Sequence, residues 1–275
     1  MAHRPEADRR SSGRHDEIVT VKAILDFRAM AAEPGNPLGA EVARFGSTTA
    51  TRLESLSGLT PYNKARGFDR SDLEHVPAIE AFFSEAGIPI GVEVSSEAQP
   101  GVTRALERRG YTEAAAVAAT LHLDLTSRPR SAEHRTAPIT SGAALEPGYL
   151  SALLDGYGFS GESPELVHVM AFEHRTPGLV RYTVGEDPVV AAAALFVWRR
   201  TAYLAGAATV PEARGRGHQR ALIARRLADA VELGCSRAVA TAAADSPSVR
   251  NLERAGFAVV STRVTWLGPD AGCGT

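Results

Sequence analysis

The chain has 275 residues, 44% of them hydrophobic, so it has room for one large or two ordinary domains with real cores. Its formal net charge of −2 excludes a general electrostatic attraction to nucleic acid or to an anionic membrane. Two cysteines, Cys235 and Cys273, are too few for a disulfide framework, and neither has metal-ligand spacing with the histidines, so no metal is expected.

The N-terminal residues 1–16 are rich in Arg, Asp, Ser and His and lack an apolar segment. They predict a disordered arm rather than a secretory signal. The longest apolar run, residues 189–198, is too short to span a bilayer. A cytoplasmic setting without a membrane partner is therefore expected.

The first half of the chain alternates helix-like and strand-like patterns, which predict one α/β domain over residues 17–126. Ser71 is expected to cap the second helix, with Glu74 as its capping-box partner. In chain order we expect a helix at 18–32, a strand at 43–53, a loop at 59–68, helices at 71–85 and 100–109 on either side of a strand at 89–94, and a strand at 114–125.

A Pro- and Arg-containing stretch, residues 127–138, predicts a linker. It is followed by a second α/β domain at 139–268 and a tail at 269–275. The expected elements are helices at 149–157, 217–233 and 247–255 and strands at 179–184, 189–198, 202–210, 237–241 and 258–267.

A glycine- and arginine-rich turn joins the strand at 202–210 to the helix at 217–233. Gly215 and Gly217 allow positive φ and close approach of a ligand to the backbone. The free N–H groups at the helix start form an anion site, to which Arg214, Arg216 and Arg220 add cationic donors. The turn lacks the Lys-Ser/Thr pair of a Walker loop and the third glycine of the dinucleotide fingerprint.

The two halves contain an internal repeat. Arg104-Ala-Leu-Glu-Arg-Arg-Gly-Tyr111 matches Arg250-Asn-Leu-Glu-Arg-Ala-Gly-Phe257, a separation of about 146 residues. Counted back equally from Tyr111 and Phe257, the place of the glycine turn is taken in the first half by Phe68 and a run of acidic residues. Acidic side chains at a helix start oppose phosphate binding, so the first copy is expected not to bind the ligand.

These residues resemble the GCN5-related N-acetyltransferase family. The match is to its strand–Arg-x-x-Gly-x-Gly/Ala–helix segment, here Pro211-Glu-Ala-Arg-Gly-Arg-Gly217, with Arg254-Ala-Gly-Phe257 at the family's distance. The resemblance covers residues 135–268 and, as a degraded copy, 18–125, similar to the tandem members. It implies a mixed, mostly antiparallel sheet flanked by helices in each copy, and acetyl-coenzyme A as acyl donor.

The resemblance also implies roles for individual residues. The end of the strand, Ala207, Ala208 and Thr209, would pair with the pantetheine arm, and a backbone N–H there would hold the thioester carbonyl. Asp245 stands where the family often has Asn. The pyrophosphate would be held by Arg214, Gly215, Arg216, Gly217, His218, Gln219 and Arg220, with Gln219 where Gly or Ala is usual.

The family's usual general acid, a tyrosine, is replaced here by Leu252. Ser248 is a candidate substitute on the same helix face, and its alternative role is that of a polar residue in a helix start capped by Ser246. Glu173, with His174, is a candidate base in the loop before residue 179, and a water chain is the alternative. The candidate lining of the acceptor site is Tyr157, Phe159 and Tyr182.

The leading hypothesis is a transferase that moves an acetyl or other acyl group from coenzyme A to an amine of a small molecule by direct attack on the thioester. One alternative uses an acyl chain on a carrier protein's phosphopantetheine. The other is a non-catalytic coenzyme A-binding regulatory module, because the usual acid and base are absent.

Overall fold

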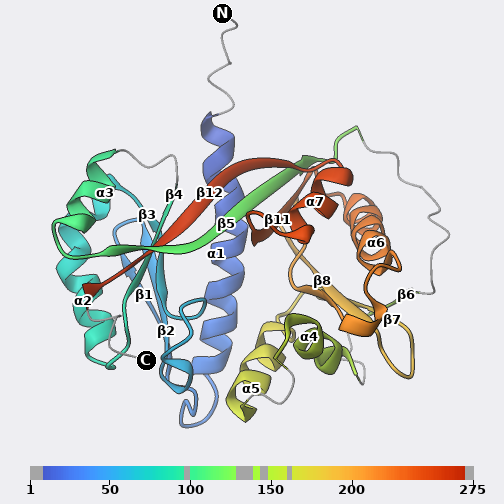
Figure 1. Ribbon diagram of the computed structural model, residues 1–275, viewed down its shortest axis with the longest axis horizontal. Helices are drawn as coiled ribbons and strands as arrows, with labels where there is room; N and C mark the ends of the chain where they lie inside the picture. Colours follow the sequence, from blue (N-terminus) through green and yellow to red (C-terminus); the bar gives the residue numbers. More distant parts are fainter. Residues whose placement is uncertain (1–8, 96–99, 128–138, 143–147, 160–162, 270–275) are drawn as a thin grey trace, which may run out of the picture. The chain divides into compact units, whose positions relative to one another are not determined.

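The computed structural model describes residues 9–95, 100–127, 139–142, 148–159 and 163–269. The chain divides into two compact units, one made of residues 1–119 and 261–275 and the other of residues 120–260. The boundary falls inside two long strands, β5 (Thr112–Asp124) and β12 (Ala258–Leu267), each of which runs from one unit into the other (Figure 1). The units therefore differ from a simple division at 127–138, of which residues 128–138 lie outside the described part.

The first unit is a mixed sheet with strand order β1-β2-β3-β4-β12. The first three strands are antiparallel neighbours, β3 and β4 are parallel, and β12 is antiparallel to β4, with Trp266 opposite Val92. Its elements are α1 (Arg9–Ala31), β1 (Ala40–Phe45), β2 (Thr48–Leu53), the 3-10 helices η1 (Glu54–Leu56) and η2 (Arg70–His75), β3 (Lys64–Phe68), α2 (Val76–Ser84), β4 (Gly91–Ser95) and α3 (Pro100–Glu107).

Several elements of the first unit depart from expectation. Helix α1 begins at Arg9, so the second half of the expected arm is helical, because no proline interrupts the chain up to Ala31; residues 1–8 lie outside the described residues. The expected strand at 43–53 is a hairpin, since Gly46 turns the chain with φ +59°. The expected loop at 59–68 contains β3, a strand whose polar Lys and Arg side chains concealed it.

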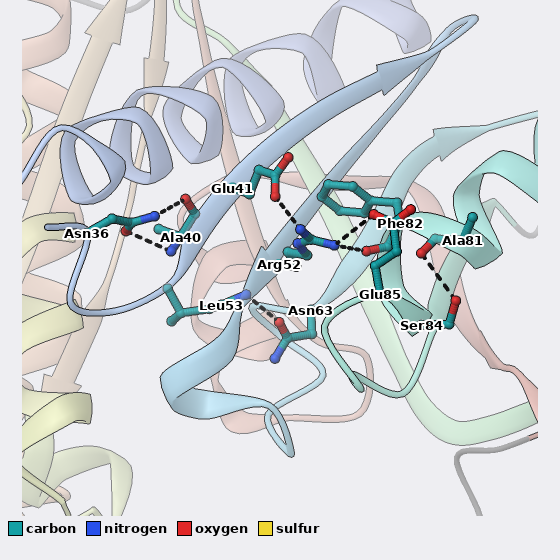
Figure 2. A network of polar contacts seen from close by, with 10 residues as sticks. All are labelled: Asn36, Ala40, Glu41, Arg52, Leu53, Asn63, Ala81, Phe82, Ser84 and Glu85. Atoms are coloured by element: carbon teal, nitrogen blue, oxygen red, sulfur yellow. Dashed lines mark hydrogen bonds and ion pairs between the residues drawn. The ribbon is translucent and has the colours of Figure 1, made fainter.

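Polar side chains hold the connections of the first unit together (Figure 2). Asn63 is fully buried; its Oδ1 accepts from the Leu53 N–H at 2.7 Å, and its Nδ2 donates to the Leu56 carbonyl at 2.7 Å. Arg52 pairs with Glu41 across the hairpin and donates to the Phe82 carbonyl. Both polar atoms of the Asn63 amide thus have partners, as burial requires, whereas the Arg52 Nε has none among the described residues.

The second unit has strand order β5-β11-β9-β8-β7-β6, with the short β10 also paired to β8. Helices α4 and α5 lie on one side of β7 and β8, and α6 lies on the other (Figure 1). Its elements are β6 (Ile139–Gly142), α4 (Tyr149–Tyr157), α5 (Pro164–Glu173), β7 (Leu179–Val184), β8 (Ala191–Trp198), β9 (Thr201–Tyr203), β10 (Ala207–Thr209), the 3-10 helix η3 (Pro211–Ala213), α6 (His218–Glu232), β11 (Arg237–Ala243) and α7 (Pro247–Arg254).

Two elements of the second unit were not expected from the sequence, β6 and α5. The expected strand at 202–210 is broken into β9 and β10 at Gly206, where φ is +39°. Gly206 has no room for a side chain, since a Cβ there would lie 2.7 Å from His174 Cε1. The break matters because β9 pairs with both β8 and β11, whereas β10 pairs with β8 and forms one wall of the site.

The two matching segments of the sequence repeat end their helices with the same backbone geometry. Helix α3 and helix α7 end in the same way, with Gly110 and Gly256 at φ +83° and +99°. The Tyr111 N–H bonds to the Leu106 carbonyl at 3.1 Å, and the Phe257 N–H bonds to the Leu252 carbonyl at 3.1 Å. The pattern is that of a Schellman cap, which requires a residue of positive φ and explains the shared Gly.

Candidate coenzyme-binding site

A pocket of about 510 Å³ lies in the second unit between β10, the glycine turn and the starts of α6 and α7. It brings together most of the residues expected to bind the donor, and Ser248 with them. Its lining consists of Gly156, Ala207, Ala208, Thr209, Ala213, Arg214, Gly215, Gly217, His218, Gln219, Arg220, Pro247, Ser248 and Asn251.

The backbone N–H and C=O groups of β10 point alternately toward β8 and away from it. Ala208 is in register with Ala192 of β8, and the Val210 N–H bonds to the Val190 carbonyl at 3.0 Å. By the alternation of an antiparallel ladder, Ala207 and Thr209 point their N–H and C=O groups away from β8. The Ala207 N–H donates to the Tyr157 hydroxyl at 2.8 Å, and the Thr209 carbonyl accepts from Arg214 Nε at 3.3 Å. This outward edge of β10 faces away from β8 and lines the pocket.

Helix α4 packs closely against β10, and this contact is possible because Gly156 has no side chain. A Cβ at Gly156 would lie 2.5 Å from the Ala208 Cβ and 3.0 Å from the Thr209 nitrogen. Arg214 ties the two elements together by donating from Nη2 to the Gly156 carbonyl at 2.9 Å. Arg214 therefore links α4 to β10 through two backbone carbonyls, and it also lines the pocket.

The start of α6 carries no side-chain cap. Its N-cap is Gly217, with φ +83°, and the first intrahelical hydrogen bond runs from the Ala221 N–H to the Gly217 carbonyl. The N–H groups of His218, Gln219 and Arg220 thus have no partner inside the helix. A Cβ at Gly217 would have nothing within 4 Å, so the turn is open at this point. Backbone N–H groups at the positive end of the helix dipole are suited to a pyrophosphate.

Three expected site residues do not line this pocket. Arg216 is exposed in the turn, and Asp245 is exposed at the start of the α7 connection. Glu173 is the last residue of α5 rather than part of a loop. Its charge nevertheless acts on Tyr157, whose pKa it helps to raise.

Other residues have roles different from those expected. Tyr182 is fully buried, and its hydroxyl donates to Asp229 Oδ2 at 2.7 Å, so it belongs to the core and not to an acceptor site. Tyr157 and Phe159 are exposed and form a tilted ring pair with centroids 6.5 Å apart. Leu252 is buried, as its apolar character requires.

The expected cap of α7 is confirmed, since Ser246 accepts from the Val249 N–H with Pro247 in the first turn. Sequence reasoning missed Gly156, Ala213, Pro247 and Asn251 as pocket residues. Asn251 could have been found, because it lies three positions after Ser248 and so on the same helix face.

Two buried groups lie near the end of β10. Tyr149 donates to the Ala193 carbonyl at 3.2 Å, and its oxygen lies 2.9 Å from His174 Nδ1. A hydroxyl has one proton, so when Tyr149 donates to Ala193, the hydrogen of its contact with His174 comes from Nδ1. Arg226 is almost fully buried and donates to the Leu222 and Ala194 carbonyls at 3.0 and 3.1 Å.

Burial lowers the pKa of Arg226 to about 10, which still leaves it charged at neutral pH. In the described part of the chain it has no carboxylate partner. A buried cation without a counter-ion is costly, and it creates a positive potential on the surrounding groups.

The equivalent helix start in the first unit is filled by its own carboxylates. Asp69 caps η2 by accepting from the Ser71 N–H, and Asp72 accepts from the Asp69 N–H. Asp72 is buried and also accepts from the Ser47 N–H at 2.9 Å and the Ser47 hydroxyl at 2.6 Å. The expected cap at Ser71 with Glu74 was therefore wrong, because the aspartate two positions earlier forms the capping box instead.

Among the described residues, no group of three or more His, Cys, Asp or Glu side chains could hold a metal ion. Within the described ranges, each helix is either too short or too polar to cross a bilayer.

The comparisons with known proteins agree with this geometry. The model of the Acetyltransferase (GNAT) family matches residues 149–257, which contain β10, the glycine turn and both helix starts of the pocket. A sequence search of curated proteins finds no match.

Solved structures share the fold at low sequence identity. A GCN5-related N-acetyltransferase from Sphaerobacter thermophilus has a TM-score of 0.59 at 14% identity, covering 83% of this chain and 75% of that one. A GCN5-related N-acetyltransferase from Kribbella flavida has a TM-score of 0.57 at 18% identity, covering 89% and 95%. A tandem GNAT protein from the clavulanic acid biosynthesis pathway has a TM-score of 0.56 at 14% identity, covering 95% and 98%.

Proposed function

We propose that the second unit binds acetyl-coenzyme A and transfers its acyl group to an amine of a small-molecule acceptor. The observation that carries this proposal is a single pocket that joins the outward backbone edge of β10 to the uncapped start of α6. The match of residues 149–257 to the acetyltransferase family model supports it. The same proposal places the protein in the cytoplasm, where coenzyme A thioesters are available.

In the proposed complex, the pyrophosphate lies against the N–H groups of His218, Gln219 and Arg220, with the Arg220 side chain beside it. The pantetheine arm follows β10 from the glycine turn toward Ala207. A strand of three residues spans about 10 Å, so the arm carries the thioester to the far end of β10. The nucleotide is held at one end of the pocket and the reacting carbon at the other.

The reaction needs no covalent enzyme intermediate. The amine nitrogen attacks the thioester carbonyl carbon, the carbonyl electron pair moves to oxygen, and its return expels the thiolate. The amine loses one proton and the thiolate gains one, giving an amide and free coenzyme A. Ser248 is the proposed proton donor within the pocket, and Glu173, or water, the proposed acceptor of the amine proton.

We further propose that the first unit is a degenerate copy that binds no coenzyme, because Asp69 and Asp72 occupy the N–H groups that a phosphate would need. Two other functions are kept as outcomes of the test. One is transfer from the phosphopantetheine of an acyl carrier protein, which lacks the nucleotide. The other is coenzyme A binding for regulation without catalysis.

The test combines calorimetry with thiol release. The full chain is titrated with coenzyme A and with pantetheine, and is then incubated with acetyl-coenzyme A and a panel of small amines while free thiol is measured. The proposal expects coenzyme A to bind more tightly than pantetheine and thiol release to depend on the amine. Equal affinity for both ligands would favour the carrier-protein donor, and binding without release across a broad panel would favour the regulatory function.

A further inference from the structure

The hydroxyl of Tyr157 lies against the first residue of β10. Tyr157 is the last residue of α4, and its oxygen accepts the hydrogen bond of the Ala207 N–H at 2.8 Å. The N–H at this end of β10 is thus committed to a side chain. A substrate carbonyl that approaches the end of β10 meets the phenol in place of the backbone N–H.

The proton of this phenol is available to a ligand. No acceptor within the described ranges takes it, since the hydrogen bond of Tyr157 to Ala207 uses only its oxygen. Tyr157 exposes 43% of its surface, whereas its hydroxyl lies within 4 Å of a Cβ built at Gly206. The hydroxyl oxygen is therefore held against the strand, and its proton has no acceptor among the described residues.

We propose, resting on the acyltransfer function above, that Tyr157 is a catalytic residue that donates a hydrogen bond to the thioester carbonyl and to the oxyanion formed from it. The Ala207 N–H polarises the phenol from behind, so that the backbone dipole acts on the substrate through the side chain. A donor placed where negative charge develops is the kind of group that lowers the barrier of acyl transfer.

The charge state of Tyr157 suits a donor that keeps its proton. Burial around the hydroxyl raises the pKa of Tyr157 to about 12, against opposing effects of the Ala207 N–H and the Arg226 cation. The phenol is therefore neutral at neutral pH. It therefore keeps its proton while it donates the hydrogen bond. The proton that the leaving thiolate takes up is proposed, as above, to come through Ser248 or water.

The buried Arg226 supports the same role. Its guanidinium lies close enough to act on the phenol oxygen of Tyr157, and in the described residues no carboxylate neutralises it. A fixed positive charge in a medium of low polarity stabilises negative charge that forms nearby, without any reorganisation during the reaction.

Tyr157→Phe tests this role, because it keeps the ring and removes the donor. The matched control is Tyr203→Phe, which removes a hydroxyl bonded to Thr241 Oγ1 at 2.9 Å on the neighbouring strand. With an amine that supports thiol release, we expect Tyr157→Phe to lower kcat roughly 100-fold, as for the loss of one oxyanion donor. The affinity for acetyl-coenzyme A should stay within about threefold, and Tyr203→Phe should leave both unchanged.

A spectroscopic measurement makes the test independent of the acceptor. Acetyl-coenzyme A with an isotope-labelled carbonyl is bound to the full chain, and the carbonyl stretch is recorded by difference infrared spectroscopy. A hydrogen bond from Tyr157 lowers this frequency, so the band should move to higher wavenumber in Tyr157→Phe and stay in place in Tyr203→Phe.

The outcomes separate the two proposals. If acetyl-coenzyme A does not bind the wild-type chain, the proposed function fails and this inference fails with it. If it binds and the carbonyl band is the same in wild type and Tyr157→Phe, the inference alone is overturned. Loss of coenzyme binding in Tyr157→Phe would also overturn it, since Tyr157 would then shape the pocket rather than act on the carbonyl.

Discussion

Two helix starts lie at counterpart positions of the sequence repeat, one in each unit. They differ in whether a side chain accepts hydrogen bonds from their backbone N–H groups. After β3, Asp69 and Asp72 form a capping box, and the buried Asp72 carboxylate also accepts two hydrogen bonds from Ser47. After β10, the helix begins at Gly217 without any side-chain cap. The first start is stabilised by its own carboxylates, whereas the second has no side-chain cap and is the proposed site of the pyrophosphate.

The difference shows what stability and binding require of the same local structure. A carboxylate at a helix start stabilises the fold by an interaction with the N–H groups and the helix dipole. The same interaction excludes a phosphate. A helix start that binds a ligand therefore forgoes its cap, and the ligand supplies that stabilisation when it binds.

The largest effect is expected from placing an acidic side chain at the uncapped start of α6, where η2 of the first unit already has one. Gly217→Asp should weaken coenzyme A binding at least about 100-fold, or about 3 kcal/mol, because a carboxylate would cap α6 and repel the pyrophosphate. Calorimetry measures the affinity. Gly217→Asn is the matched control for the strain at φ +83°, since Asn is similar in size and uncharged. An equal loss in both variants would mean that strain, and not charge, causes the effect.

The stability of the first unit should also depend on acid, through a buried carboxylate in its sheet. Glu93 bonds Lys64 at 2.6 Å and lies 3.4 Å from Arg263. Burial alone would raise the pKa of Glu93, but the two cations outweigh it and lower the pKa to about 2. A depressed pKa gives stability that is complete above the ordinary value near 4.3 and is lost as the pH falls from there toward 2, about 3 kcal/mol in all.

This loss can be followed through Trp266, which lies in the core of the first unit, in a Trp198→Phe background that removes the other tryptophan. Glu93→Gln should be less stable at neutral pH and should show a flatter dependence between about pH 4.5 and pH 2. A pH dependence as steep as that of the parent would assign the acid sensitivity to other carboxylates.

Removing the Asp72 carboxylate from the start of η2 should lower the stability of the first unit without creating a coenzyme-binding site. Asp72→Ala leaves the Ser47 and Asp69 donors without their acceptor, at a cost of about 2 kcal/mol in the free energy of unfolding of the first unit. Denaturant titration followed through Trp266 measures it. Coenzyme A affinity should not change, and a second binding event in calorimetry would contradict the view that only the second unit binds.

The smallest effect is expected from removing a charged side chain at the uncapped start of α6. Arg220 lines the pocket, so Arg220→Ala should weaken coenzyme A binding about tenfold and reduce its salt dependence. Arg216, exposed in the turn but outside the pocket lining, provides the comparison. A larger loss in Arg216→Ala than in Arg220→Ala would mean that the phosphates lie farther out on the turn.

Local signals predicted much of the fold. The helix Tyr149–Tyr157 and the strand Ala258–Leu267 have the expected bounds, and α7 has the expected Ser246 cap. The failures follow from features that one residue controls. Gly46 and Gly206 each divide an expected strand, because positive φ turns the chain where the apolar pattern alone continues.

The site was less predictable than the fold. The glycine turn is local, so its place at a helix start could be read from the sequence. The bond between Tyr157 and Ala207 joins residues 50 positions apart, and the close approach of Gly156 to β10 depends on tertiary packing. Tyr182 shows the reverse error, because its polar hydroxyl suggested a site while Asp229 satisfies it in the core.

Most of β12 belongs to the first unit although it follows the second unit in the sequence, and this has a consequence for synthesis on the ribosome. Strand β4 gains its second neighbour from β12, the last strand of the chain. Until residue 267 has been made, β4 has an unpaired edge, and the first core lacks Trp266. An unpaired edge invites association with other chains. The N-terminal unit therefore cannot complete its fold until the second unit has been translated, although its sequence comes first.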